Sequence, residues 1–284
     1  MAQRSTFRDA AGDVAWQKQL RDRYEADGLP PVPHLDISRA VIKPVSRKLA
    51  EQIILKYEWL GTMAPTSHHY GIFFGLYCAG VCCFGFSAGA NLNAYKEWGT
   101  ESGEVGYLAR GANTHWSPDG ANSKLVSWAC KLLAKDTGAK LVIAYSDTDA
   151  GEIGTIYQAC NWVCVGRGSS TRQWIAPNDR IYDQKYPSDL RRRDGKKYPR
   201  QWYVNELRRL GWKEQDSNPK WRYVFILDKK DKRLRELVES KRVPYPKREN
   251  ITPPVNGDNV ATNHAGRFDP DPEALLDTPV TLTD

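Results

Sequence analysis

The chain has 284 residues and a net charge of +7, and its 40% hydrophobic content with ten tryptophans is ample for a core. The sequence holds no run of about 18 apolar residues, which excludes a membrane-spanning helix. Its first residues are charged and lack the apolar segment of a secretory signal, so we expect a cytoplasmic protein. The six cysteines lie in apolar stretches without a Cys-x-x-Cys pair, which favours buried free thiols over a metal site, although Cys160 and Cys164 could supply two ligands.

The charge is distributed unevenly along the sequence. Residues 180–248 carry 22 Lys and Arg against 10 Asp and Glu, whereas residues 249–284 carry one Arg against seven acids. A positively charged face attracts polyanions. We therefore expect a polyanion-binding surface that is followed by an acidic tail.

The first elements expected are an arm, a strand and a helix. Residues 1–35 are polar and helical in character, and prolines end them because proline cannot continue a helix. Residues 37–45 predict a strand. Ser46 follows as the N-cap of an amphipathic helix in which apolar residues recur at helical spacing.

Strands and helices then follow one another in a pattern that predicts one sheet. Residues 69–77 and 80–86 are rich in aromatic and β-branched residues, which predicts a tight hairpin through Cys78 and Ala79. The elements expected after the hairpin are a strand at 104–110, a helix at 124–135, a strand at 140–145, a short helix at 154–162, a strand at 163–166, a strand at 221–227 and a last charged helix.

This order predicts an α/β (α+β) fold with a mixed, mostly antiparallel central sheet flanked by helices. We expect the helical arm at residues 1–35 and a single catalytic domain at 36–243. A basic, aromatic insertion at 180–212 interrupts that domain. Residues 244–284 have little hydrophobic periodicity, which predicts an acidic, disordered tail.

A carboxylate and a phenol lie close together in the stretch from residue 144 to residue 168. Asp147 follows the continuous apolar run at 140–145, and Tyr157 lies on the next predicted helix. Open α/β sheets bind ligands beyond the carboxyl ends of their strands, where an acid can orient or deprotonate an amine and a tyrosine can donate a proton. The alternative is that Asp147 caps the following turn and Tyr157 packs on the sheet.

Six short segments between residues 45 and 170 carry a distinctive pattern. They are 57–63 (YEWLGTM), 71–75 (GIFFG), 108–110 (LAR), 122–124 (NSK), 145–147 (YSD) and 154–162 (GTIYQACNW). In these segments the chain resembles the Mom family of phage DNA-modification proteins. That resemblance implies a GNAT-like acyltransferase fold, modification of the exocyclic amine of adenine in phage DNA, protection of that DNA from restriction, and a location in the host cytoplasm.

Position by position, the resemblance makes Asp147 the catalytic carboxylate. It places Arg110, Ser123 and Tyr157 in the same cleft, and it adds Tyr57 to the site. Tyr57 matches a tyrosine that often follows a histidine in the family.

In this chain Lys56 stands where that family histidine is expected. His68 or His69 could take its place in space, although a histidine at the start of a strand is more often a surface residue.

The resemblance also implies acetyl-CoA or a related acyl-CoA as the donor. GNAT enzymes hold its pyrophosphate with backbone amides before a helix, and the equivalent segment is residues 116–124. The usual glycine-rich pattern is missing there, Asp119 would repel a phosphate, and Asn122 could instead be an ordinary N-cap. The candidate binding residues are Gly120, Ala121 and Asn122 through their amides, and Ser123 and Lys124 through their side chains.

The insertion at 180–212 mixes cations with aromatic residues. Phosphates need cations and an extruded base needs a flat surface, so the mixture favours double-stranded DNA as a partner. The alternative is a solvated charged face. The candidate DNA-binding residues are Arg191, Arg192, Arg193, Lys196, Lys197, Arg200, Trp202, Arg208 and Arg209, among Tyr182, Tyr186, Tyr198 and Tyr203.

Three functions remain open at this point. The first is an enzyme that binds duplex DNA, extrudes an adenine and transfers a small acyl-derived group to its amine, with Asp147 as the orienting base. The second is a GNAT acetyltransferase for a small-molecule or protein amine. The third is a DNA-binding protein on the same scaffold that catalyses nothing.

Overall fold

The computed structural model describes residues 35–58, 62–86, 94–177 and 181–247. Their contacts divide them into two compact units. The larger unit consists of the described residues up to 170 together with 218–247, and the smaller unit consists of residues from 171 to 217. The arm predicted at 1–35 and the tail predicted at 244–284 lie almost entirely outside the described residues.

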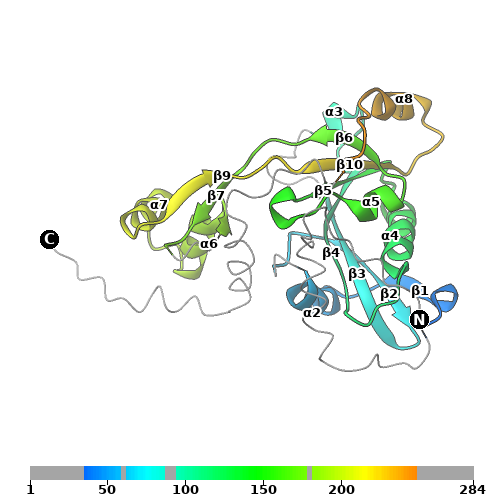
Figure 1. Ribbon diagram of the computed structural model, residues 1–284, viewed down its shortest axis with the longest axis horizontal. Coiled ribbons are helices and arrows are strands. Elements are labelled where there is room, and N and C mark those ends of the chain that lie inside the picture. The colour runs from blue at the N-terminus through cyan, green and yellow to red at the C-terminus, as the bar shows by residue number, and fades with distance from the viewer. Residues whose placement is uncertain (1–34, 59–61, 87–93, 178–180, 248–284) are drawn as a thin grey trace. The chain divides into compact units, whose positions relative to one another are not determined.

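A seven-stranded sheet forms the centre of the larger unit (Figure 1). The strands are β1 (Val41–Pro44), β2 (His68–Phe74), β3 (Tyr77–Phe86), β4 (Val105–Asn113), β5 (Leu141–Ser146), β6 (Val163–Arg167) and β10 (Trp221–Ile226). They follow the order β1-β2-β3-β4-β5-β10-β6, and within the described residues only β4 and β5 pair in parallel. The mixed, mostly antiparallel sheet expected from the sequence is therefore confirmed.

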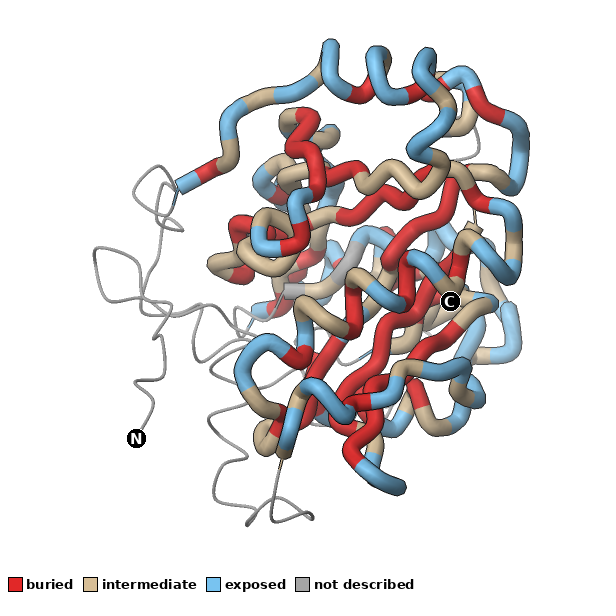
Figure 2. The backbone as a smooth tube through the Cα atoms, turned by 90° about the vertical axis from the view of Figure 1, so that its right-hand side faces the viewer, coloured by how far each residue is buried: buried red, intermediate tan, exposed pale blue. Residues whose placement is uncertain are grey.

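Helices cover both faces of this sheet. They are α2 (Arg47–Tyr57), α3 (Ala94–Glu97), α4 (Ala121–Thr137), α5 (Thr155–Ala159) and α8 (Lys232–Ser240). Alternate side chains of a strand point to opposite faces. Along β5, Val142 and Ala144 pack in one cluster with α4, whereas Leu141 and Ile143 pack in another with α8. The strands are consequently buried between helices whose outer sides are exposed (Figure 2).

The strand predicted at 37–45 begins instead with a short turn. Ile37–Arg39 is a 3₁₀ helix, and β1 follows it. The cause is local, because the carboxylate of Asp36 accepts hydrogen bonds from the amide and the hydroxyl of Ser38 at 2.8 and 2.7 Å. Such a side-chain bond offers the backbone an alternative to the ladder of a sheet.

Caps determine where the two long helices begin. The N-cap predicted at Ser46 is confirmed, because its hydroxyl accepts the amide of Leu49 at 3.2 Å. The helix predicted from 124 begins earlier, at Ala121, after Gly120 with φ +80°. Asn122 therefore lies inside the first turn, and the alternative that made it the N-cap is wrong.

The connection between β2 and β3 differs from the predicted one. Gly75 and Leu76 form the turn, and Cys78 and Ala79 lie within β3. Gly75 has φ +59°, a left-handed conformation that glycine adopts without a steric penalty. The turn is therefore centred on the glycine rather than on the two residues between the aromatic runs.

The smaller unit folds around a core of its own. A three-stranded sheet in the order β8-β7-β9 carries two helices. Its elements are β7 (Arg172–Ile175), β8 (Ile181–Asp183), α6 (Tyr186–Arg193), α7 (Arg200–Arg209) and β9 (Lys213–Asp216). Trp174, Tyr186, Leu207 and Trp212 are buried together in it. The basic insertion predicted at 180–212 thus lies within a folded unit that the chain enters after β6 and leaves before β10.

Gly154, directly before α5, and Gly138, at the end of α4, differ in the space around them. Gly154 and Gly138 have nearly the same left-handed φ, +72° and +73°, but a Cβ on Gly154 would overlap the ring of Tyr223, whereas a Cβ on Gly138 would meet nothing within 4 Å. We expect Gly138→Ala to lower the free energy of unfolding by about 1 kcal/mol and Gly154→Ala to lower it by about 1–3 kcal/mol more. Urea denaturation measures both, and equal losses would contradict the packing.

Candidate active site

The strands β4 and β5 separate near their carboxyl ends. Their parallel pairing ends at Leu108 and Ala144, although β4 continues to Asn113. The pairing of β3 with β4 passes over Ala109, which forms a bulge. A bulge bends its strand. Ligands of open α/β sheets bind beyond the carboxyl ends of strands, and the predicted site residues Arg110 and Asp147 both lie at this place.

Asp147 directly follows β5 and is held on two sides. Its side chain is buried, and its Oδ2 lies 2.7 Å from Nζ of Lys220. Its carbonyl oxygen accepts the amides of Ala150 and Glu152 at 3.1 and 3.0 Å, which closes a short 3₁₀ turn. The carboxylate therefore has a defined position and a cation beside it.

Glu152 introduces a second carboxyl group next to Asp147. Burial, together with the nearby negative charges of Glu58 and Asp147, raises the pKa of Glu152 to about 8, although Lys220 and the amide of Asp147 oppose the shift. A carboxyl group with this pKa is mostly protonated at neutral pH. It can therefore donate a hydrogen bond where Asp147 accepts one.

Arg110 contacts the end of α2 and the chain after it. Its Nε donates to the carbonyl oxygen of Thr62 at 2.7 Å and lies 3.9 Å from the buried carboxylate of Glu58. Glu58 in turn acts electrostatically on Glu152. Arg110 therefore belongs to the same charge network as Asp147 through these two acids.

Tyr157 lies on α5 in an aromatic cluster. Its ring centroid is 5.0 Å from that of Trp162 and 5.2 Å from that of Tyr223. Burial raises the pKa of Tyr157 well above its usual value, and the neighbouring Glu152 contributes in the same direction. The phenol therefore keeps its proton, and Glu152 links it electrostatically to Asp147.

Tyr57 packs on the other face of the sheet, in the cluster of α2. Its hydroxyl lies 3.0 Å from Nδ1 of His115. His68 and His69, which were predicted as possible replacements for the family histidine, bond instead to their neighbours Ser67 and Thr66. The histidine beside Tyr57 is thus His115, which the sequence did not single out.

The start of α4 presents main-chain amides. The first amides of a helix have no hydrogen-bond acceptor in a preceding turn. In α4 the first helical hydrogen bond runs from the amide of Lys124 to the carbonyl oxygen of Gly120 at 3.0 Å. The amides of Asn122 and Ser123 therefore have no acceptor within the helix. The side chain of Lys124 points elsewhere, since its Nζ donates to the carbonyl oxygen of Ile37 at 2.5 Å.

Sequence reasoning missed three charged residues of this site. Glu58 and Glu152 lie within stretches that it singled out, so their acidity was a usable signal. Lys220 stands just before a predicted strand and carries no local signal. Only the pairing of β10 with β5 brings it to Asp147.

The predicted DNA-binding cations of the smaller unit fall into three groups. Those in ion pairs with acidic side chains are Arg192, Arg208 and Arg209. Two others, Arg191 and Arg200, donate to the carbonyl oxygen of Tyr198 and the hydroxyl of Ser188. The remaining cations are exposed and form no ion pair with any described residue, and they are Arg193, Lys196 and Lys197.

The aromatic residues of the insertion divide between core and surface. Tyr182 and Tyr186 pack against Trp212 with centroids 5.0 and 5.1 Å apart, so they stabilise the smaller unit and are not free to stack on a base. Tyr198 and Trp202 stack on each other at 4.2 Å, and Trp202 is 37% exposed. This pair is the aromatic surface that the unit offers beside its exposed cations.

The cysteines are free thiols, as expected, and all but Cys78 are buried. Over the described ranges, no three His, Cys, Asp or Glu side chains gather in a way that could hold a metal ion. None of the helices in the described part of the chain is long and apolar enough to cross a membrane.

A sequence model described as the Mom protein family matches residues 39–247. No protein among the curated sequences matches the chain.

Several solved structures are similar to the chain at low sequence identity. A putative arylalkylamine N-acetyltransferase of the yellow fever mosquito is 9% identical, with 68% of this chain and 92% of that chain covered and a TM-score of 0.40. The N-acyl amino acid synthase FeeM from uncultured soil microbes is 12% identical, with coverages of 67% and 93% and a TM-score of 0.38. An acetyltransferase of Bacillus subtilis in complex with CoA is 10% identical, with coverages of 66% and 98% and a TM-score of 0.36.

The raised pKa of Glu152 predicts a stability that depends on pH. Between its usual value of 4.5 and about 8, the folded protein binds more protons than the unfolded chain, so the free energy of unfolding falls as pH rises. The slope due to this group is at most about 1.4 kcal/mol per pH unit. We expect Glu152→Gln to flatten the curve over this window in urea unfolding, whereas Glu236→Gln, which alters a carboxylate that is 68% exposed, leaves it unchanged. Parallel curves for all three proteins would contradict the assignment.

Proposed function

Because this chain belongs to the Mom protein family, we propose that it is a transferase that modifies DNA. It transfers a small acyl-derived group to the exocyclic amine of a base, adenine, in phage-type DNA. The modified base would protect that DNA from restriction. The proposal joins the family membership to the chemistry that the residues around Asp147 can perform.

One observation supports this function most directly. The carboxylate of Asp147 is buried where β4 and β5 separate, with Nζ of Lys220 at 2.7 Å from its Oδ2. The ammonium group orients this carboxylate and balances its charge. A positioned carboxylate can accept a hydrogen bond from an attacking amine and take its proton as the new bond forms. Asp147 is therefore assigned as the orienting base.

Two protonated groups that are linked electrostatically to Asp147, directly or through each other, can act as donors. Tyr157 keeps its phenolic proton, and Glu152 holds its proton at neutral pH because burial raises the pKa of both. A leaving group or a developing negative charge needs such donors. The neighbourhood thus combines one acceptor with two donors.

An acyl thioester such as acetyl-CoA would supply the acyl group and a thiolate leaving group. The main chain at the start of α4 fits its anionic pyrophosphate, because the first-turn amides of Asn122 and Ser123 are free of helical acceptors and the helix dipole favours an anion there. The side chain of Lys124 does not fit, since its ammonium group bonds to the carbonyl oxygen of Ile37. We therefore propose that the amides, and not the side chain of Lys124, hold the pyrophosphate of the acyl donor.

The smaller unit supplies the DNA-binding surface in this proposal. Arg193, Lys196 and Lys197 are exposed, and the stacked pair Tyr198 and Trp202 lies in the same stretch of chain. Exposed cations release counterions when they contact phosphates, and exposed aromatic rings stack on bases. The ion-paired arginines contribute less, because an acidic partner already balances their charge.

The base modification is tested with Asp147→Asn, which keeps the shape of the side chain but removes the proton acceptor. We expect the modified nucleoside to fall at least about 100-fold in DNA co-expressed with the variant, as measured by mass spectrometry. Glu236→Gln on α8 is the matched control and should modify DNA normally.

Modification by Asp147→Asn at the wild-type level would refute the role of Asp147. An unmodified DNA with the wild-type protein would refute the function, and turnover of acetyl-CoA with free amines would then favour the acetyltransferase. Salt-sensitive DNA binding without a new nucleoside would favour a binding protein.

The DNA surface is tested by neutralising the exposed cations. We expect the triple variant Arg193→Gln, Lys196→Gln and Lys197→Gln to weaken duplex binding about tenfold or more near physiological salt and to reduce the slope of log K against log salt by up to about 3. The double variant Arg208→Gln and Arg209→Gln removes two ion-paired charges and should change both quantities less. Fluorescence anisotropy with labelled duplexes over a salt series measures them, and an unchanged triple variant would exclude this surface.

A further inference from the structure

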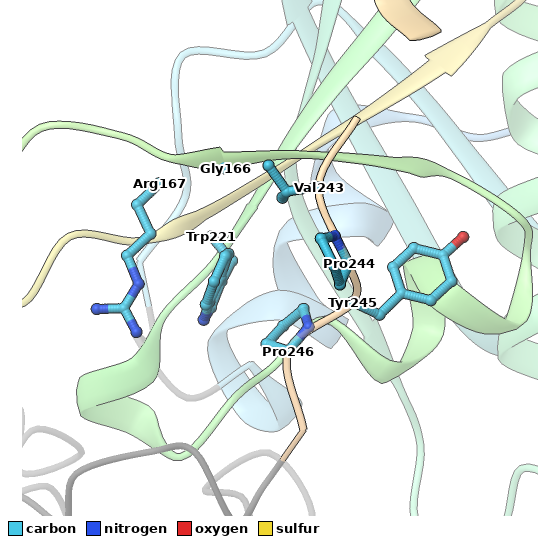
Figure 3. Close-up of a pocket in the computed structure, with 7 residues that line it drawn as sticks. All are labelled: Gly166, Arg167, Trp221, Val243, Pro244, Tyr245 and Pro246. Atoms are coloured by element: carbon cyan, nitrogen blue, oxygen red, sulfur yellow. The ribbon is translucent and has the colours of Figure 1, made fainter. Parts of the chain in front are cut away.

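A pocket that does not include Asp147 or its charged partners opens on the larger unit, next to β6 and β10. Its volume is about 410 Å³. One side is formed by the end of β6 and the start of β10, and the other by the segment Val243–Pro246, which follows α8 (Figure 3). Neither the family match nor the charge network around Asp147 assigns a role to it.

The indole ring of Trp221 is the central wall of the pocket. The guanidinium group of Arg167 lies 4.6 Å from the centroid of this ring. Figure 3 shows the ring standing between Arg167 on one side and the rings of Pro244 and Pro246 on the other. Arg167 is exposed and forms no ion pair with an acidic side chain of the described residues. The pocket thus combines flat apolar rings with an exposed cation that has no acidic partner among the described residues.

The segment opposite Trp221 is anchored at three points. The amide of Val243 donates to the carbonyl oxygen of Cys164 at 2.9 Å, and the hydroxyl of Tyr245 donates to that of Trp162 at 2.7 Å. The side-chain amide of Gln158 reaches the carbonyl oxygen of Pro246 at 3.4 Å. Two prolines also restrict the backbone of the segment. The wall is therefore held in place before any ligand arrives, which lowers the entropy cost of binding.

The pocket lies at the same edge of the sheet as Asp147. Trp221 pairs with Ser146, the residue directly before Asp147, and Lys220, directly before Trp221, forms the ion pair with Asp147. Neighbouring strands are about 4.8 Å apart. A flat group bound against Trp221 would therefore lie on the strand next to the one that Asp147 follows.

We propose that this pocket binds the nucleobase of a nucleotide, stacked between Trp221 and the rings of Pro244 and Pro246, with Arg167 bound to the nucleotide's phosphate. Every base has a flat π face that stacks on an aromatic ring, and its phosphate needs a cation. The volume of about 410 Å³ is large enough to admit a base. The assignment rests on the proposed function in one respect: the base held here is the one extruded from DNA toward Asp147.

The proposal is tested by titrating the full-length protein with 2′-deoxyadenosine 5′-monophosphate, 2′-deoxyadenosine and inorganic phosphate in a calorimeter. We expect the monophosphate to bind more tightly than either part alone. Trp221→Leu should lower the affinity for the monophosphate and for the nucleoside about tenfold or more, because stacking is lost. Arg167→Gln should lower only the affinity for the monophosphate, to the value found for the nucleoside.

Two further variants control for folding and for nonspecific stacking. Trp221→Phe preserves an aromatic wall and should bind with an intermediate affinity, and Trp128→Leu removes a 48% exposed tryptophan on α4 and should bind like the wild type. Three results would refute the proposed nucleotide site. They are no binding of the monophosphate to the wild type at millimolar concentration, equal affinities for phosphate alone and for the monophosphate, and an unchanged affinity for the monophosphate after Trp221→Leu.

The same variants separate this pocket from the proposed function. If the wild type leaves DNA unmodified but binds the monophosphate through Trp221, the nucleotide site is supported and the proposed DNA-modifying function is refuted. If Trp221→Leu modifies DNA at the wild-type level and binds the nucleotide normally, the proposed function is supported and the nucleotide site is refuted.

Discussion

The position of β10 between β5 and β6 is the constraint on which the rest of this structure depends. Because β10 pairs antiparallel with both neighbours, its first residue lies opposite Ser146, and the preceding Lys220 reaches Asp147. One strand thereby completes the sheet, places a cation on the central carboxylate and provides Trp221 as the wall of a pocket. The chain enters β10 only after the whole smaller unit, so residues distant in sequence meet at one edge.

The electrostatics around Asp147 follow from that edge. Three carboxyl groups, those of Glu58, Asp147 and Glu152, form one charge network with the cations Arg110 and Lys220. Three ionised carboxylates beside two cations would leave an unbalanced charge in a partly buried place, which is costly. The protein avoids this cost because Glu152 keeps its proton near neutral pH. The arrangement consequently provides an acceptor and donors at one place without a net buried charge.

The smaller unit shows why a mixture of basic and aromatic residues is ambiguous in a sequence. A unit of this size has little apolar surface with which to form a core, so Tyr186 and Trp212 are buried in it. The same composition leaves Tyr198 and Trp202 stacked near the surface, next to exposed cations. Composition therefore singled out this stretch of chain, and packing decided which of its basic and aromatic side chains are exposed.

The sequence by itself determined the parts of this protein that depend on near neighbours along the chain. Ser46 as a cap, the buried strand before Asp147 and the helix with Tyr157 follow from local hydrogen bonding and periodicity. Only the tertiary structure decided that Lys220 reaches Asp147 and that Lys124 bonds to the carbonyl oxygen of Ile37. Such contacts depend on which strands become neighbours in the sheet, and no local pattern encodes that choice because it results from the packing of the whole chain.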